Sequence, residues 1–471
     1  MAKGTSFRIE SDSLGSREVP AGAYWGIHTL RARENFPVST RCIGDYPDLV
    51  VALAHVKKAA ALANREVSGL DGRIARVIAK ACDEIAAGRL RDQFVVGVIQ
   101  GGAGTSTNMN ANEVIANRAL ELLGMERGRY DVVDPIDHVN RSQSTNDVYP
   151  TAIKLAMIYS LSGLFEELEL LQSAFAARGA AFAGILKIGR TQLQDAVPMT
   201  LGQEFTGFAT TLAEDRARLQ ETVPWLCEVN LGATAIGTGI TADPRYASAV
   251  RGRLAAVTGL PIVTAPDLIE ATSDTGVFMA LSGMLKRSAM KLSKICNDLR
   301  LLSSGPQAGL GEINLPPKQA GSSIMPGKVN PVIPEMFNQI AFSVMGADTT
   351  VAMAAEAGQL QLNAFEPVIA HSILQSIDWM TRGVRSLRVN CVEGITANEG
   401  HLAASVGSSI GVVTALTPHI GYAAAAQLAH DALVSHRTIA ELVVEAGLML
   451  ADEVAAALSP VRLAGARYPA P

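Results

Sequence analysis

The chain has 471 residues and a formal net charge of −5 at pH 7, with 18% charged residues. This mildly acidic balance and the lack of a long basic run argue against nucleic acid as the main partner. A chain of this length exceeds one compact core, so two or three domains are expected.

The sequence shows no signal peptide and no uninterrupted apolar run long enough to cross a bilayer. Five cysteines lie far apart without a CxxC pair, which favours free buried thiols in a reducing compartment. We therefore expect a cytoplasmic protein without membrane contact. Because 48% of the residues are hydrophobic and the mean hydropathy is +0.21, we also expect an obligate oligomer that covers apolar helices.

Residues 1–146 are expected to form an N-terminal domain of mixed but mostly helical structure. Short extended pieces and turns fill residues 1–45. Helical periodicity follows over 49–64 and over 74–87, where Gly88 ends the pattern, and returns over 113–123.

A glycine-rich stretch, 100–110, precedes the last of these helices. It lacks the Gly-Lys-Ser/Thr of a P-loop and the strand that would lead into one. A flexible turn is one interpretation. The other is an anion-binding nest, in which glycines let backbone amides and the hydroxyls of Thr105, Ser106 and Thr107 point inward in front of a helix.

A second polar stretch, 138–147, contains Ser144, Thr145 and Asn146 before a long helical pattern. Helix capping explains one or two of its polar side chains, but not four neutral hydrogen-bonding groups in succession. His138 is expected to be structural, because no neighbour marks a triad or a metal site.

The central part of the chain, 147–396, is predicted to be a bundle of long helices. The expected helices cover 151–182, 201–230, 267–303, 336–362 and 367–391. The breaks between them carry polar or small residues, as in 189–198 and 232–239. Polar groups at helix breaks are a plausible lining for a site, although a bundle alone defines no function.

Residues 397–471 are expected to form a small C-terminal helical domain with helices over 423–436, 439–446 and 451–458. Their turn spacing is similar to that of a helix-turn-helix. Because no basic face accompanies it, a helical cap is preferred over DNA binding.

The most informative stretch is the loop at 321–331, which leads to Glu335. Its glycines and prolines exclude a helix interior or a central strand. Within nine positions it places the hydroxyls of Ser322 and Ser323, the ammonium of Lys328 and the carboxamide of Asn330. These groups suit the binding of a carboxylate and reaction at the carbon beside it.

Gly-Ser-Ser-Ile-Met-Pro-Gly-Lys-Val-Asn-Pro, at 321–331, resembles the signature of the fumarase/aspartase superfamily, whose members eliminate a group beside a carboxylate to leave fumarate. The two polar stretches above resemble its other two signature regions. The resemblance covers nearly the whole chain, and three further segments are similar to bacterial aspartases: 189–200, 293–306 and 354–362.

This resemblance implies a mainly α-helical, three-domain subunit with a central bundle of five long helices. It further implies a homotetramer with a twenty-helix core, in which each active site draws the three signature regions from three chains. The implied reaction is the reversible deamination of L-aspartate to fumarate and ammonia. It needs no organic cofactor, and the sequence reveals no metal site.

The chemistry requires removal of a weakly acidic proton from carbon three, which places a second negative charge on the β-carboxylate as an aci-carboxylate. Several convergent donors are needed, because one well-aimed donor is worth about 3 kcal/mol. The resemblance makes Ser322 the base, and a serine is a poor base unless its alkoxide is stabilised. The loop amides and Lys328 are candidates for that stabilisation.

The remaining roles also follow from the resemblance. The expected ligands of the α-carboxylate are Thr191, Lys328 and Asn330. The expected ligands of the amino group are Thr105, Asn146 and Gln192. The expected donors to the β-carboxylate are Thr105, Ser144, Thr145 and the amides of 322–324, and Ser323 is expected to bind substrate. Glu335 is expected to orient the loop, although an acid in the first turn of a helix is an alternative reading.

Gln192 stands where many members of the superfamily, fumarases included, carry a histidine. Glutamine cannot transfer protons. A hydratase benefits from a proton donor to expel hydroxide, whereas an ammonium group already carries its proton. Gln192 therefore favours an ammonia-lyase over a fumarate hydratase. A lyase with another amine or acid substrate, and a catalytically silent structural relative, are further alternatives; the presence of Ser322, Lys328 and Asn330 disfavours the silent relative.

Overall fold

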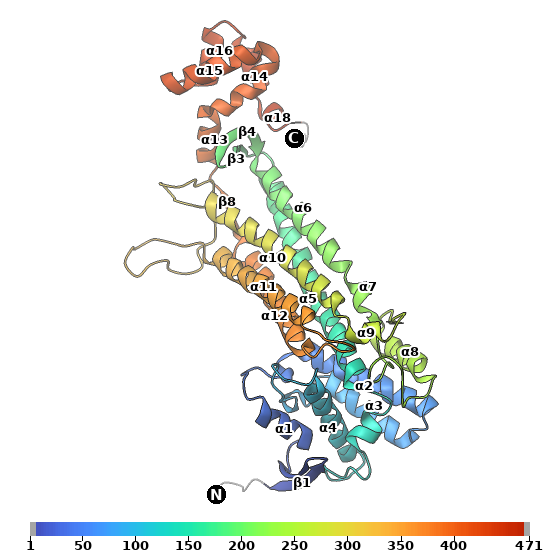
Figure 1. Ribbon diagram of the computed structural model, residues 1–471. Coiled ribbons are helices and arrows are strands. Elements are labelled where there is room, and N and C mark those ends of the chain that lie inside the picture. The colour runs from blue at the N-terminus through green and yellow to red at the C-terminus, as the bar shows by residue number, and fades with distance from the viewer. Residues whose placement is uncertain (1–5, 466–471) are drawn as a thin grey trace. The chain divides into compact units, whose positions relative to one another are not determined.

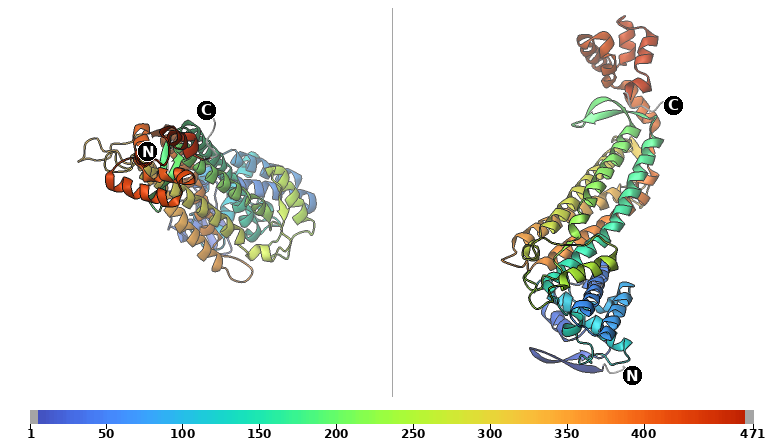
Figure 2. Two further views of the ribbon diagram at one scale, coloured as in Figure 1. Left: turned by 90° about the horizontal axis from the view of Figure 1, so that it is seen from above. Right: turned by 90° about the vertical axis from the view of Figure 1, so that its right-hand side faces the viewer.

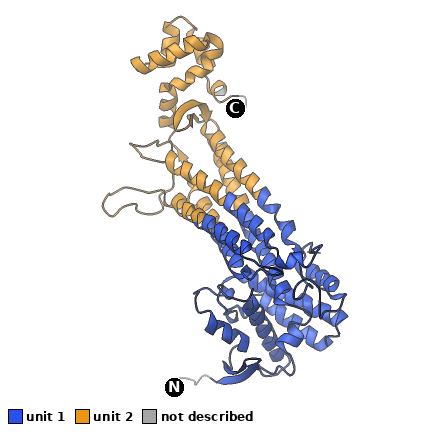
Figure 3. Cartoon of the chain, viewed as in Figure 1, with its two compact units in different colours: residues 1–165, 217–287, 343–379 blue, residues 166–216, 288–342, 380–471 orange. Residues whose placement is uncertain are grey.

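The computed structural model describes residues 6–465 (Figure 1). The chain divides into two compact units (Figure 3). Unit 1 comprises 1–165, 217–287 and 343–379, and unit 2 comprises 166–216, 288–342 and 380–471. The three domains expected from the sequence divide the chain differently, and their boundaries stay a prediction.

Five long helices dominate the fold, as expected, and each has residues in both units. They are α5 (Thr145–Ala181), α6 (Leu201–Gln220), α10 (Gly276–Leu302), α11 (Val332–Glu356) and α12 (Glu366–Asn390). The expected helix over 201–230 ends early, because Pro224 opens the short α7 (Val223–Leu226). The pattern over 267–303 is interrupted after α9 (Glu270–Ser273), where Asp274 is extended and its side chain accepts from Gly276 N.

Within unit 2 these helices pack through aromatic rings and ion pairs. Phe175 of α5 lies against Phe205 and Phe208 of α6, with ring centroids 6.1 and 5.6 Å apart. Glu167 of α5 is almost fully buried, and Arg385 Nε of α12 lies 2.6 Å from its carboxylate. The apolar stripes of the sequence are therefore interhelical contacts, as the mainly α-helical fold class requires.

The rest of unit 1 is mostly helical. A β-hairpin of β1 (Phe7–Asp12) and β2 (Gly15–Pro20) opens the described chain and is followed by α1 (Ile27–Asn35). Helix α2 (Pro47–Val67) packs on α3 (Gly72–Ala86) and on α8 (Tyr246–Thr258), which was not predicted. The helix α4 (Thr105–Leu122) packs on α3, and β5 (Glu228–Val229) pairs in parallel with β6 (Val263–Thr264).

Unit 2 also contains the hairpin β3 (Leu186–Thr191)–β4 (Gln194–Thr200) and the short antiparallel pair β7 (Ile313–Asn314)–β8 (Thr396–Ala397). The C-terminal helices gather beside the β3–β4 hairpin (Figure 2), and Ile188 of β3 belongs to their apolar cluster. These helices are α13 (Glu399–Ser408), α14 (Val413–Ile420), α15 (Tyr422–Ser435), α16 (Ile439–Glu445), α17 (Ala451–Ala457) and α18 (Pro460–Leu463). Short 3-10 or π segments complete the chain at Ile43–Asp45, Arg91–Gln93, Pro135–Val139, Val392–Gly394 and Ile410–Val412.

Among residues 6–465, one helix by itself has the length and mean hydropathy of a candidate membrane span. Helix α5 contains a window with a mean hydropathy of 1.2, long and apolar enough by length and composition to cross a membrane. The consecutive helices 399–408 and 410–420 pass the same test only if the bent pair is taken as one span. In α5, 67% of the window is buried inside the fold, as in the core helix of a globular protein. All five cysteines are free, and four are buried.

Candidate active site

Helix α4 begins at Thr105 rather than at Glu113, so the expected loop over 100–110 is half helix. Thr105 and Thr107 therefore lie on the first turn. Thr107 is buried and donates from its hydroxyl to Gln100 Oε1 at 3.0 Å, so its predicted role in an anion nest is wrong. Thr105 is exposed, and its hydroxyl donates to the Gly102 carbonyl at 2.7 Å. In this state Thr105 presents lone pairs, which suits an ammonium better than a carboxylate.

The early start of α4 depends on Gly104, which has a φ of 89° at the N-cap and no room for a side chain. A Cβ there would overlap the ring of Tyr149, with Cδ2 only 2.8 Å away. We expect Gly104→Ala to lower the free energy of unfolding by about 2–5 kcal/mol, from left-handed strain and overpacking together.

Thermal or urea unfolding of the purified variant measures that loss. Gly124 is the matched control, because it has a φ of 76° at the other end of α4 but nothing within 4 Å of the added Cβ. Gly124→Ala should cost only the strain, about 1–2 kcal/mol. Equal losses in the two variants would show that contact with Tyr149 is unimportant.

The second polar stretch is held by Asp147, whose carboxylate is fully buried. It accepts from Ser144 N at 3.0 Å and from the amides of Gly232 and Thr234 at 3.1 and 3.0 Å. Desolvation raises the pKa of Asp147 to about 6, against these hydrogen bonds. Asp147 therefore joins the small-residue break at 232–239 to the polar stretch, and this contact was not predicted from the sequence.

The side chains of this stretch are oriented by backbone contacts. Ser144 Oγ accepts from Asn146 N at 3.2 Å, which leaves the Ser144 proton free to be donated. Asn146 Nδ2 donates to the Ala235 carbonyl at 2.7 Å, so the Oδ1 of Asn146 is its remaining acceptor. These orientations suit a carboxylate at Ser144 and an ammonium at Asn146. His138 Nδ1 accepts from Asp134 N at 2.9 Å, a backbone contact typical of a structural histidine.

The break predicted at 189–198 is a β-hairpin, and Thr191 and Gln192 lie at its tip. Its two-residue turn consists of Gln192 and Leu193, with φ values of 53° and 64°. Two left-handed residues form the type of turn that matches the strand twist, usually with Asn-Gly. Because Gln-Leu carries no such signal, the hairpin was not predicted. Within this turn, the strained backbone belongs to Gln192, a candidate site residue, and to its neighbour Leu193.

A buried ionic cluster joins the stem of this hairpin to Glu312, which precedes the loop at 321–331 in the chain. Lys187 Nζ lies 2.6 Å from Glu312 Oε2 and 2.7 Å from Glu204 Oε2, and Arg190 pairs with the other oxygen of Glu312. The side chains of Lys187 and Glu312 are only 2% and 3% exposed. Glu312 directly precedes β7, after which the chain enters the loop that carries Ser322. No sequence motif indicated this cluster.

Glu312→Ala should therefore leave Lys187 and Arg190 short of a buried anion. We expect the free energy of unfolding to fall by about 3–5 kcal/mol, as when one partner of a buried ion pair is removed. Glu221→Ala is the control, because Glu221 and its partner Arg218 are 55% and 58% exposed. The control should cost less than about 1 kcal/mol. Similar unfolding midpoints for both variants would contradict this role of Glu312.

The loop at 321–331 contains no helix or strand, as predicted. Two hydrogen bonds close its base: Gly321 N donates to the Lys328 carbonyl at 2.9 Å, and Asn330 Nδ2 donates to the Gly321 carbonyl at 2.8 Å. Inside this closure, Ser322 Oγ accepts from Ile324 N at 3.1 Å and from Met325 N at 2.9 Å. Two amide donors on one hydroxyl oxygen favour its charged form.

The other candidate site residues of the loop differ in their exposure. Ser323 and Lys328 are exposed, while Asn330 is half-buried. Glu335 lies in the first turn of α11, as the alternative reading of this residue expected. Its role in orienting the loop stays a prediction.

The predicted site residues divide between the two units. Unit 1 holds Thr105, Ser144, Thr145 and Asn146; unit 2 holds Thr191, Gln192, Ser322, Ser323, Lys328, Asn330 and Glu335. Within unit 1 the starts of α4 and α5 lie side by side, and Asn108 Nδ2 of α4 donates to Thr145 Oγ of α5 at 3.0 Å. The assembly of all these residues into one site stays a prediction.

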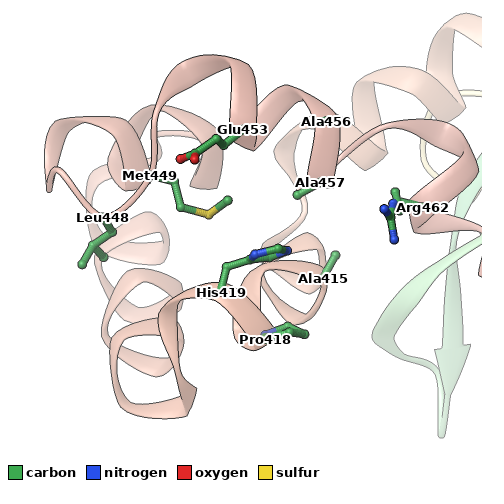
Figure 4. A pocket seen from close by; sticks show the side chains of 9 residues that line it. All are labelled: Ala415, Pro418, His419, Leu448, Met449, Glu453, Ala456, Ala457 and Arg462. Carbon is green, nitrogen blue, oxygen red and sulfur yellow. The ribbon is translucent and has the colours of Figure 1, made fainter.

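A pocket of about 820 Å³ lies among the C-terminal helices of unit 2 (Figure 4) and contains none of the predicted site residues. Its lining includes the polar side chains of His419, Glu453 and Arg462, and the carboxylate of Glu453 already accepts from Leu450 N. Among residues 6–465, no group of three or more His, Cys, Asp or Glu side chains is arranged to hold a metal ion.

The chain matches two protein-family models and is similar to proteins of known function. Residues 15–346 match a family model described as Lyase, and residues 412–465 match one described as Fumarase C C-terminus. The chain is 59% identical over 450 residues to an aspartate ammonia-lyase of Pseudomonas fluorescens, covering 95% of this chain and 94% of the relative.

Two solved structures share the fold over nearly the whole chain. A fumarate lyase:delta crystallin from Brucella melitensis bound to cobalt is 54% identical, with a TM-score of 0.95 over 98% of this chain and 100% of that one. A class II fumarase from Schistosoma mansoni is 34% identical, with a TM-score of 0.93 over the same shares. The chain therefore belongs to the fumarase/aspartase superfamily of lyases.

Proposed function

We propose that this chain is a carbon–nitrogen lyase that deaminates L-aspartate reversibly to fumarate and ammonia. The similarity to relatives that act as aspartate ammonia-lyases supports this substrate. The observation that carries the chemistry is the hydrogen-bonded state of Ser322, whose Oγ accepts two backbone amide protons in a glycine-rich loop. This arrangement suits a serine that acts as an alkoxide base.

In the proposed reaction, the Ser322 alkoxide takes the proton from carbon three of aspartate. The electron pair of that C–H bond moves onto the β-carboxylate, which becomes an aci-carboxylate. The pair then forms the new double bond as the C–N bond breaks on the opposite face. The nitrogen keeps the C–N pair and leaves as neutral ammonia, since the ammonium already carries three protons.

The charge that develops on the β-carboxylate needs donors that are already oriented. Ser144 has a hydroxyl proton to donate, because its oxygen accepts from a backbone amide. Each such donor contributes about 3 kcal/mol when it is aimed at the developing charge. Thr145 would add a second hydroxyl donor for the same carboxylate, while the amides of Ile324 and Met325 remain bonded to Ser322 Oγ.

The other two groups of aspartate need different ligands: the ammonium needs hydrogen-bond acceptors, and the α-carboxylate needs donors or a cation. Thr105 Oγ and Asn146 Oδ1 are available as acceptors for the substrate ammonium. Lys328, Asn330 and Thr191 would bind the α-carboxylate. Gln192 adds an acceptor but no acid, so the chain has no protonated side chain there to expel hydroxide. This difference favours deamination over hydration.

We further propose a homotetramer in which each site takes its signature regions from three chains, with a twenty-helix core. Large apolar side chains remain exposed on the long helices, which supports burial by other copies of the chain. These residues are Leu170 on α5, Met279, Met290 and Leu301 on α10, Phe342 and Met353 on α11, and Trp379 and Val389 on α12. A cytoplasmic location is proposed with it, supported by the five free cysteines.

The discriminating experiment incubates the purified protein with fumarate, once with ammonium and once in water alone. We expect aspartate to form with ammonium and little malate to form without it. Malate as the dominant product would identify a fumarate hydratase instead. Neither product from fumarate would direct the search to other amines and acids.

A further inference from the structure

A chain of buried amides connects the ammonium of Lys57 to the hydroxyl of Thr145. Lys57 is fully buried and donates to Asn140 Oδ1 at 2.8 Å. Asn108 Nδ2 donates to the same oxygen at 3.1 Å and to Thr145 Oγ at 3.0 Å. Asn112 Nδ2 donates to Asn140 Oδ1 as well, at 3.2 Å.

The direction of every hydrogen bond in this network follows from the orientation of the Asn140 amide. Asn140 Nδ2 donates to the Gln143 carbonyl at 3.2 Å, so the Asn140 atom that contacts Lys57 is the oxygen. The Asn108 group beside that oxygen must then be the NH₂, which has two protons to donate. One proton goes to Asn140 and the other to Thr145, and Thr145 Oγ is left as an acceptor.

Burial lowers the pKa of Lys57 to about 7, because desolvation disfavours its charged form. Either protonation state keeps at least two N–H groups for the two amide oxygens that Lys57 contacts, Asn140 Oδ1 and Gln143 Oε1 at 3.0 Å. Backbone carbonyls also hold the amide nitrogens of Asn140 and Gln143, so the two amide oxygens face Lys57 whatever its charge.

Because Thr145 Oγ accepts from Asn108, the Thr145 proton is left for a different acceptor. Among residues 6–465, Thr145 Oγ makes this one hydrogen bond, as the acceptor. We propose that Asn108 is a positioning residue that fixes the Thr145 hydroxyl as a donor toward the substrate β-carboxylate. Asn108 itself is buried, and its amide nitrogen is directed to Asn140 and Thr145. The inference deepens the proposed function and rests on it.

A fixed donor is more useful here than a free hydroxyl. A hydroxyl that must reorient as charge develops spends free energy on reorganisation, whereas a pre-oriented one does not. Because the aci-carboxylate carries more charge than the ground-state carboxylate, the effect should appear mainly in kcat rather than in KM. Thr145 is almost fully buried, so few waters compete for its proton.

The test is a double-mutant cycle of Asn108→Asp and Thr145→Val, with fumarate release from aspartate as the readout. An aspartate at position 108 accepts where asparagine donates, so the Thr145 proton would turn inward. Each single variant should lower kcat/KM by roughly a hundredfold, the cost of one lost donor. The double variant should lie within about threefold of Thr145→Val alone, because both changes remove the same donor.

Asn110→Asp is the matched control. Asn110 lies on the same helix, is fully buried, and donates to the Gln93 carbonyl at 3.0 Å, away from Thr145. Whatever loss it causes should multiply with that of Thr145→Val. If Asn108→Asp does not fold, Asn108→Leu replaces it, and its loss should likewise disappear in the Thr145→Val background.

Two outcomes would contradict the role of Asn108 and leave the proposed function intact. One is a double variant whose loss is the product of the single losses, as expected for a purely structural Asn108. The other is an Asn108→Asp variant that keeps wild-type kcat/KM. A folded wild-type protein that releases no fumarate from aspartate overturns the proposed function, and the inference with it.

Discussion

Replacing Ser322 with alanine should lower kcat for aspartate deamination by about a thousandfold while the protein stays folded. The substitution removes the oxygen that takes the carbon-three proton, and a positioned base contributes roughly 10²–10⁴-fold. Ser322 is only half-buried in a loop, and its hydroxyl is bonded to two loop amides rather than to the helical core. The fold should therefore tolerate the change, which circular dichroism and size-exclusion chromatography would verify.

Ser303→Ala is the matched control. Ser303 lies just after α10, and its hydroxyl donates to the carbonyl of Arg300 at 3.3 Å. The control should keep kcat within about twofold, as expected of a surface substitution away from the chemistry. A Ser322→Ala variant that turns over aspartate like the control would remove Ser322 as the base.

Replacing Lys328 with arginine should lower kcat/KM by about a hundredfold. The charge is kept, but a forked guanidinium does not occupy the place of a compact ammonium. A substrate displaced by about 1 Å loses roughly that factor. Steady-state kinetics with aspartate would measure the loss, and we expect both a higher KM and a lower kcat if Lys328 binds the α-carboxylate.

Lys318→Arg serves as the control for Lys328→Arg. Lys318 is exposed in the same segment, before the closure of the loop at Gly321. It has no assigned contact with substrate, so its replacement should leave kcat/KM unchanged. Unchanged constants in Lys328→Arg as well would show that Lys328 is not a ligand of the carboxylate.

The elements that the sequence predicted well are those with a strong local signal. The five long helices have a sustained helical period, and the loop at 321–331 is punctuated by glycine and proline. The start of α4 was predicted too late, because all residues from Thr105 to Asn110 except Met109 are polar types that favour caps and loops when isolated. In the fold, Gly104 packs on Tyr149, and Thr107 is buried against Gln100.

The features that escaped prediction depend on contacts between distant residues. Asp147 holds the amides of Gly232 and Thr234, and Glu312 pairs with Lys187 and Arg190. Neither carboxylate has a local motif that distinguishes it from a solvated side chain. Their burial marks them as supports of the site, and burial follows only from the three-dimensional fold.

The central claim is that Ser322 Oγ acts on carbon three of the substrate in a site completed by other chains. A crystal structure of the assembled protein with an unreactive analogue of aspartate tests it most directly. We predict Ser322 Oγ about 3–3.5 Å from the carbon beside the β-carboxylate, the distance of a reactive encounter. Thr105, Ser144, Thr145, Asn146 and Thr191 from neighbouring chains should contact the same molecule. An analogue bound by those residues with Ser322 turned away in a closed loop would contradict the account.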